Sequence, residues 1–130
     1  MATSPAFVST PRLTSASLSA ANTAIDGSGT ITSLISGVAA GTRVLEIDTQ
    51  CSATSAAALV NLFISADSGT TWVLFDQIAI TAATSSTTVK ANRNSATYQN
   101  LILPGTAYSI GCTTTIAQAT KVHALAGDLT

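Results

Sequence analysis

Apolar and polar residues alternate most clearly between Ala57 and Thr81, which is also the densest apolar stretch of the chain. Its first half places Val60, Leu62 and Ile64 on one side. Its second half continues the alternation at Trp72, Leu74, Ile78 and Ile80. A period of two residues is typical of a strand with one buried face. The pattern therefore predicts two long strands joined by a turn at Asp67-Ser68-Gly69, where Asp and Gly suit turn geometry.

The opposite side of this hairpin is also apolar, because Phe63, Val73 and Phe75 point away from the first set. An apolar second side predicts that the hairpin meets another layer or another subunit. We therefore treat these three residues as candidate assembly contacts. Phe7 and Val8 join them, as the only large apolar side chains after Met1 in the N-terminal segment 1–11. That segment is interpreted as an arm that docks on a partner, with a frayed tail as the alternative.

Turn signals divide the rest of the chain roughly every ten residues, a spacing typical of small all-β domains. The clearest are Asp26-Gly27-Ser28-Gly29 and Pro104-Gly105. Helical periodicity is absent. Strands are expected near 12–25 (an edge strand), 30–35, 42–52, 98–103, 106–115 and 118–125, with Leu45, Ile47 and Cys51 facing inward in the third of these. The pattern predicts one all-β domain over residues 12–130, an antiparallel β-sandwich or jelly-roll-like barrel.

Charged residues make up only 8% of the chain and the net charge is −1, against a usual charged share of about 25%. The five basic residues are scattered, so no patch suited to a phosphate backbone exists and nucleic acid is not an expected partner. No segment is apolar enough for a signal peptide or a membrane span. A surface this weakly charged favours a component of an assembly, made in a cytosol.

Residues that could support catalysis or metal binding are few. His123 is the only histidine, and Glu46 and Asp48 share one face of a predicted strand, which an exposed polar face explains. Cys51 and Cys112 lie in phase with apolar residues and are expected to be buried thiols, with a disulfide formed later as the alternative. Two Cys and one His are too few for a metal site. We predict no catalytic, metal-binding or cofactor-binding residue, and no enzyme.

The turn of the hairpin resembles a known motif. Residues 65–72 match the Asp-box pattern S-x-D-x-G-x-T-W of sialidase-like propellers at Ser65, Asp67, Gly69, Thr71 and Trp72. The resemblance implies a structural turn in which Asp and Ser or Thr hold the loop and Trp packs beneath it. It does not imply an active site. A propeller needs several such repeats, and 130 residues cannot supply them.

The layout as a whole resembles small virion proteins of tailed bacteriophages. The resemblance lies in a Ser/Thr/Ala-rich start, in F-I-S-x-D-x-G-T-T-W-x-L-F-D-x-I-x-I-T at 63–81, in the polar segment TAATSSTTV, and in Y-x-N-L-I-L-P at 98–104 followed by Y-S-I-G. It implies a capsid decoration or cement protein that is made in the bacterial host cytoplasm and resides in the virion. The implied partners are the major capsid protein or other virion subunits, and copies of itself as a homo-oligomer, with a trimer among the forms.

The alternative function is a tail- or surface-associated module that binds carbohydrate or a host surface. Trp72, Tyr98 and Tyr108 would form its sugar-stacking platform. Packing of these aromatics into the core is the competing and favoured interpretation.

Overall fold

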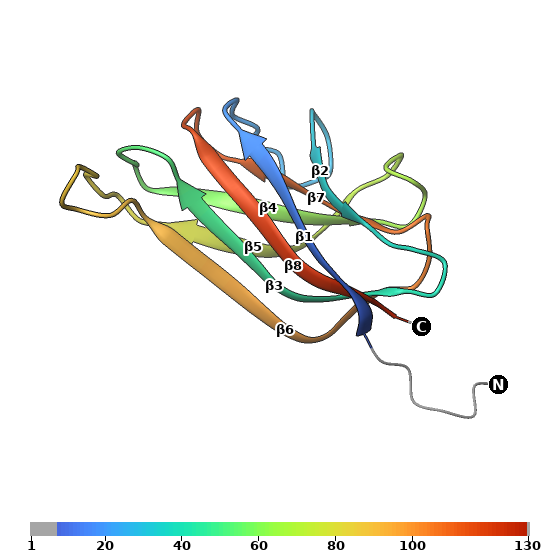
Figure 1. Ribbon diagram of the computed structural model, residues 1–130. Coiled ribbons are helices and arrows are strands. Elements are labelled where there is room, and N and C mark those ends of the chain that lie inside the picture. The colour runs from blue at the N-terminus through green and yellow to red at the C-terminus, as the bar shows by residue number, and fades with distance from the viewer. Residues whose placement is uncertain (1–7, 130) are drawn as a thin grey trace.

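Eight β-strands make up the regular structure of residues 8–129. The computed structural model describes residues 8–129, and these residues contain no helix (Figure 1). The strands are β1 (Val8–Leu18), β2 (Thr32–Ser36), β3 (Thr42–Cys51), β4 (Ala58–Ser65), β5 (Val73–Ile80), β6 (Arg93–Leu103), β7 (Ser109–Thr114) and β8 (Thr120–Leu129). The predicted all-β class is confirmed.

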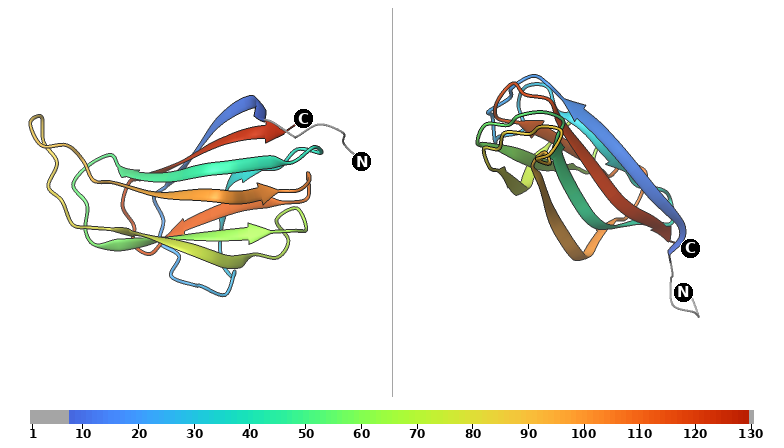
Figure 2. Two further views of the ribbon diagram at one scale, coloured as in Figure 1. Left: turned by 90° about the horizontal axis from the view of Figure 1, so that it is seen from below. Right: turned by 60° about the vertical axis from the view of Figure 1, so that its left-hand side comes forward.

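The strands form two antiparallel sheets. Sheet A has the order β1-β8-β3-β6, and sheet B has the order β2-β7-β4-β5. Figure 1 shows sheet A in front of sheet B, and Figure 2 shows the connecting loops gathered at the two ends of the strands. Among the described strands only β4 and β5 are consecutive within one sheet, and every other connection crosses to the opposite sheet. Eight strands arranged in this way form a jelly roll.

The hydrophobic core lies between the two sheets. Sheet A contributes Val44, Ile47, Val122 and Ala124, and sheet B contributes Val60, Leu62, Ile110 and Cys112, all of which are fully buried. Removal of their apolar surface from water is the main force that holds the two sheets together. Cys51 also lies in this core, and the prediction of two buried, free thiols is confirmed.

A β-bulge in β3 corrects the predicted orientation of Leu45. The register with both neighbouring strands shifts between Val44 and Glu46, so Leu45 is an extra residue. Val44 therefore faces the core and Leu45 points outward, with 41% of its surface exposed. After the bulge, Ile47 and Cys51 face inward as predicted. One inserted residue reverses the phase of a period-two pattern.

A second bulge changes the outward face of the central hairpin. Leu62 pairs with Asp76 but Phe63 pairs with Leu74, so Phe75 is the extra residue of β5. Residues that lie opposite each other across strands point to the same side. Leu74 therefore shares the outer face of sheet B with Phe63, whereas Ile78 faces the core. The predicted common face for Trp72, Leu74, Ile78 and Ile80 is wrong for this reason.

Strand β1 begins earlier than the predicted boundary at residue 12. It starts at Val8, which pairs with Leu129, and Pro11 lies within it opposite Gly127. Because β1 is an edge strand, it has a free side on which a missing N–H group costs nothing, and a proline is tolerated there. Residues 8–11 thus belong to the domain and not to an arm, and Phe7 lies outside the described residues.

A polar network ties three strands together at one end of sheet A. The Arg12 guanidinium forms an ion pair with Asp128 at 3.2 Å and donates to the Ser36 carbonyl oxygen at 2.8 Å. Thr42 Oγ1 donates to the same carboxylate at 2.8 Å. The network joins β1, β8 and β3 to the end of β2, where the sheets approach each other.

Candidate assembly surfaces

The turn between β4 and β5 is held by side-chain hydrogen bonds. Ser65 Oγ donates to Asp67 Oδ1 at 2.7 Å, and the Thr71 N–H donates to the same oxygen at 2.8 Å. The Gly69 N–H donates to Ser65 Oγ at 2.9 Å. The Thr71 N–H first, and then Ser65, lower the pKa of Asp67 because both stabilise its charged form. Asp67 Oδ1 thus accepts two hydrogen bonds within the turn, and the carboxylate has a structural role there.

Trp72, which follows this turn, helps to cover the outer face of sheet B. Its ring lies so close over Gly111 that a Cβ added there would stand 3.0 Å from it and 2.6 Å from Ile31. The connection between β1 and β2, residues 19–31 and here named the β1–β2 loop, reaches the same place. A Cβ at Gly27 would stand 2.2 Å from the Trp72 carbonyl oxygen, and Gly27 has a φ of 87°. The loop and the indole therefore form a third layer on sheet B.

This third layer corrects one candidate assembly contact. Phe63 pairs with Gly111 across the strands, beneath Trp72, and none of its surface is exposed. The predicted partner for this apolar side is therefore part of the same chain. Phe63 is not available to a second molecule. The sequence did not reveal this because the β1–β2 loop, which covers Phe63 together with Trp72, lies more than thirty positions before it.

The remaining candidate contacts have different surroundings. Phe75 is half-buried against the ring of Tyr98, at a centroid distance of 6.1 Å and an interplanar angle of 49°. Val73 is 60% exposed and, with Ile64, borders a shallow hollow of about 390 Å³. Val8 lies in β1, and Phe7 is outside the described residues. Val73 is thus the one predicted contact whose described side chain is freely exposed.

A larger apolar surface, which the sequence did not indicate, lies on the outer face of sheet A. Leu13 of β1 is 73% exposed, Ile102 of β6 is 45% exposed, and Leu45 stands out at its bulge. Leu13, Leu45 and Leu125 line a shallow hollow of about 390 Å³ with Pro11, Arg12 and Ala126. Large apolar side chains grouped on a surface mark interaction sites. The weak alternation of β1 did not predict that Leu13 would be exposed, and the bulge in β3 reversed the predicted direction of Leu45.

The other half of this face is charged. The Arg93 guanidinium bonds to Asp48 Oδ2 and lies 3.9 Å from Glu46 Oε1. Asp48 is largely buried in this cluster, contrary to the exposed polar face expected for it. Glu46 has a raised pKa, chiefly because its carboxyl group shares a hydrogen bond with Asp48, and then because of partial desolvation. The cluster is an ion-pair network in which two carboxylates share one cation.

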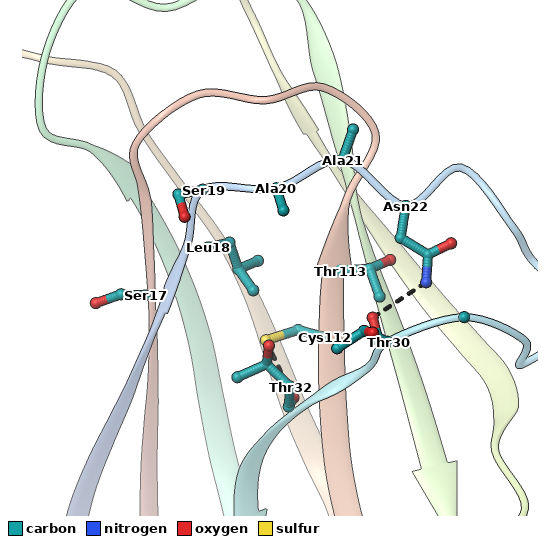
Figure 3. Close-up of a pocket in the computed structure, with 11 residues that line it drawn as sticks. Ser17, Leu18, Ser19, Ala20, Ala21, Asn22, Thr30, Thr32, Cys112 and Thr113 are labelled. Atoms are coloured by element: carbon teal, nitrogen blue, oxygen red, sulfur yellow. Dashed lines mark hydrogen bonds between the residues drawn. The ribbon is translucent and has the colours of Figure 1, made fainter.

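A cavity of about 360 Å³ lies where the β1–β2 loop leaves the sandwich (Figure 3). Asn22 Nδ2 donates to the Thr30 carbonyl oxygen at 3.1 Å, and the Cys112 thiol donates to the Thr32 carbonyl oxygen at 3.8 Å. Burial raises the pKa of Cys112 to about 12. The residues that line this cavity include no histidine and no carboxylate. Hydroxyl and amide groups there stabilise the loop and offer no acid or base.

The aromatic residues of the alternative function do not share a surface. Trp72 lies on the outer face of sheet B, whereas Tyr98 and Tyr108 pack against the core. The Tyr98 hydroxyl donates to Asp76 Oδ2 at 2.7 Å, and Asp76 lies in β5 at the edge of sheet B. The favoured interpretation, core packing, holds for both tyrosines.

Residues 8–129 contain no group of three or more His, Cys, Asp and Glu side chains placed to hold a metal ion. In the same part of the chain, no helix is long and apolar enough to span a membrane. His123 lies opposite Asp48 across β8 and β3.

Comparison with known proteins identifies relatives in structure only. No protein-family model matches the chain, and no curated protein sequence matches it. A solved chain in the acid-stable capsid of Helicobacter pylori bacteriophage KHP30 is similar, with a TM-score of 0.55, 11% identity, and coverage of 94% of this chain and 90% of that chain. The fold is shared.

Two particles of infectious bursal disease virus also contain similar chains, both at 14% identity. The TM-scores are 0.38 and 0.33. This chain spans about a third of each, covering 31% and 32% of their lengths.

Proposed function

We propose that this chain is a non-enzymatic structural protein of a bacteriophage virion, and that it decorates or cements the head. The observation that carries the proposal is the coextensive match to a chain of a phage capsid, which includes 94% of this chain and 90% of the other. Viral shell proteins commonly use the jelly roll, although the fold also serves other functions.

The surface supports an assembly role. Leu13, Val73 and Ile102 expose large apolar side chains, while charged residues are scarce. The carboxylates that could have served a hydrolase are engaged: Glu46 and Asp48 with Arg93, and Asp67 with its turn. The partners we propose are the major capsid protein or other virion subunits, joined after synthesis in the host cytoplasm.

Analysis of purified particles of the encoding phage tests this function. We expect quantitative mass spectrometry to find the chain in a fixed ratio to the major capsid protein, and cryo-electron microscopy to place its jelly roll on the head. Particles that lack the gene should release their DNA at a lower temperature than wild-type particles. Absence of the chain from washed particles would overturn the proposal, and density on the tail would restrict it to a different position.

Because Trp72, Tyr98 and Tyr108 do not share a surface, they form no aromatic platform that would support the carbohydrate-binding alternative. We expect Trp72 fluorescence to stay unchanged when glycans of host cell walls are titrated into the protein. Saturable quenching by one of these glycans would favour the alternative.

A further inference from the structure

The loop that covers sheet B is bonded chiefly to itself. Among the described residues, residues 23–31 make hydrogen bonds only within the β1–β2 loop. The Asn22 side chain holds them together, since its Nδ2 donates to the carbonyl oxygens of Ser28 and Thr30, each at 3.1 Å. The Asn22 N–H donates to the Thr114 carbonyl oxygen of β7 at 2.9 Å, which fixes the start of this segment to sheet B. Residues 23–31 therefore form a unit that is attached at its ends.

Packing alone holds this unit against the outer face of sheet B. Ile31 lies over Gly111, and Gly27 lies against the Trp72 carbonyl oxygen. Every residue from 23 to 31 is exposed or half-buried, so the unit has no core of its own. Segments with few buried apolar contacts and no hydrogen bonds to their surroundings open more readily than the rest of a protein.

Two polar side chains on the covered face lack partners while the loop is closed. Asn61 of β4 and Thr113 of β7 lie directly opposite each other, on the same outer face as Phe63. Asn61 is fully buried and Thr113 is 2% exposed. Asn61 Nδ2 and Thr113 Oγ1 nevertheless have no hydrogen-bond partner among the described residues. A buried polar atom without a partner costs free energy, and contact with water removes that cost. These two atoms therefore oppose the closed arrangement.

The cavity of about 360 Å³ at the start of the loop lies beside one of these atoms. Thr113 lines it from β7, and Asn22, Gly29 and Thr30 line it from the loop (Figure 3). Space, and not close packing, thus separates much of the loop from Thr113. Outward movement of the loop breaks few contacts there and brings water to the Thr113 hydroxyl.

We propose that residues 23–31 are a strap that opens from sheet B as one unit, between its attachments at Asn22 and Thr32. The closed form excludes water from Phe63 and leaves the two polar atoms without partners. The open form hydrates both atoms and exposes the apolar row of Phe63 and Gly111. The strap thereby lets the chain hold an apolar surface closed in one state and present it in another, a property that goes beyond a fixed structural role.

Thiol labelling of Thr113→Cys tests the strap. The substitution nearly conserves volume and removes a hydroxyl that has no partner, so we expect the circular dichroism spectrum and the urea midpoint of the wild type. In native buffer an aromatic disulfide reagent should modify one thiol per chain slowly. The rate should stay nearly constant in urea below the unfolding transition, because local opening exposes little surface.

Thr114→Cys is the matched control. Thr114 is the next residue of β7, is fully buried, and lies opposite Val60 on the core side of sheet B. Its thiol, like those of Cys51 and Cys112, should react only across the unfolding transition. A second pair of variants is made in the Thr113→Cys protein. Asn22→Ala removes the bonds that hold the strap together and should accelerate modification about tenfold. Ser86→Ala removes similar bonds within the β5–β6 connection and should leave the rate unchanged.

Two outcomes overturn the proposal. If Thr113→Cys reacts only with the unfolding transition, as Thr114→Cys does, the covered face opens only when the whole chain unfolds. If it reacts as fast as Ile25→Cys, whose side chain is 60% exposed on the loop, no opening is needed to reach it. Asn61→Cys, on the opposite strand, serves as the probe if Thr113→Cys does not fold. These solution experiments do not depend on the role in the virion, which the particle analysis tests separately.

Discussion

Gly111 is the residue at which the third layer touches the sandwich most closely. It lies in β7, pairs with Phe63, and is covered by Ile31 and the ring of Trp72. Gly111 does not have a positive φ. A glycine is needed here because it has no side chain, which leaves space for the residues above it. The contact lets the indole and the loop approach the sheet closely enough to exclude water from Phe63.

Gly111→Ala is expected to destabilise the protein by about 1–3 kcal/mol, because the new methyl group forces the overlying residues outward. Urea denaturation followed by Trp72 fluorescence measures the effect. Gly105→Ala is the control, because a Cβ at Gly105 meets nothing within 4 Å. Equal midpoints for the two variants would contradict the close packing described for Gly111.

Glu46 is expected to make stability depend on pH. Its pKa in the folded protein lies above the ordinary value of 4.5, so the folded state binds the proton more tightly than the unfolded state. The stabilisation is complete below pH 4.5 and is lost as the pH rises through the raised pKa. Glu46→Gln, which imitates the protonated form, should lose this dependence and exceed the wild type in stability at neutral pH. Urea midpoints between about pH 4 and pH 7 measure it.

Asp26 provides a control, because its contribution to stability should change with pH in the opposite direction. A hydrogen bond from the Ser28 hydroxyl, at 2.6 Å, is the chief reason that its pKa lies below the ordinary value of 3.8. Its contribution is present above pH 3.8 and is lost as the pH falls through the lowered pKa. If the stability of Glu46→Gln changed with pH as that of the wild type does, the hydrogen bond between the Glu46 and Asp48 carboxyl groups would not be the cause of the pH dependence.

At the scale of elements, the sandwich is closed at one side by a contact between the edge strands β5 and β6. Tyr98 of β6 donates its hydroxyl hydrogen to Asp76 of β5 at 2.7 Å, and its ring packs on Phe75. The two residues belong to different sheets. Desolvation first, and then the Asp76 carboxylate, raise the pKa of Tyr98 well above its ordinary value of 10.0.

Tyr98→Phe is expected to lower stability by about 1–2 kcal/mol, because Asp76 loses a donor while the ring packing stays. The raised pKa of Tyr98 also means that its contribution is complete below pH 10.0 and is lost as the pH rises above that value. Thermal unfolding at neutral and alkaline pH measures both effects. Unchanged melting of Tyr98→Phe relative to wild type at neutral pH would show that the bond contributes nothing.

The strands and the central turn could be predicted from the sequence because their signals are local. Val60, Leu62 and Ile64 alternate within one strand, and Asp67 and Gly69 act within one turn. The two bulges could not be predicted, since an inserted residue is defined only by the neighbouring strand; Leu45 and Leu74 were misplaced for this reason. The burial of Phe63 depends on a distant loop. The exposed outer face of sheet A could not be predicted either, because its four strands are not consecutive in the sequence.

At the scale of the whole molecule, the two thiols report on global unfolding. Cys51 and Cys112 lie in the core, and burial raises the pKa of Cys112 to about 12, so its reactive thiolate is scarce. We expect neither to react with an aromatic disulfide reagent in native buffer, and both to react in urea at a rate that follows the unfolding transition. Rapid reaction of one thiol in the native protein would instead reveal local opening near it.

Strand β8 lies between β1 and β3, in the interior of sheet A, although it is the last strand in chain order. During synthesis, therefore, β1 and β3 emerge from the ribosome long before the strand that joins them. Until residues 120–129 appear, sheet A has an empty central position and two unpaired strand edges. Such edges readily pair with other nascent chains. Ribosome stalling before residue 120 should consequently produce aggregates, and productive folding should wait for the final ten-residue strand.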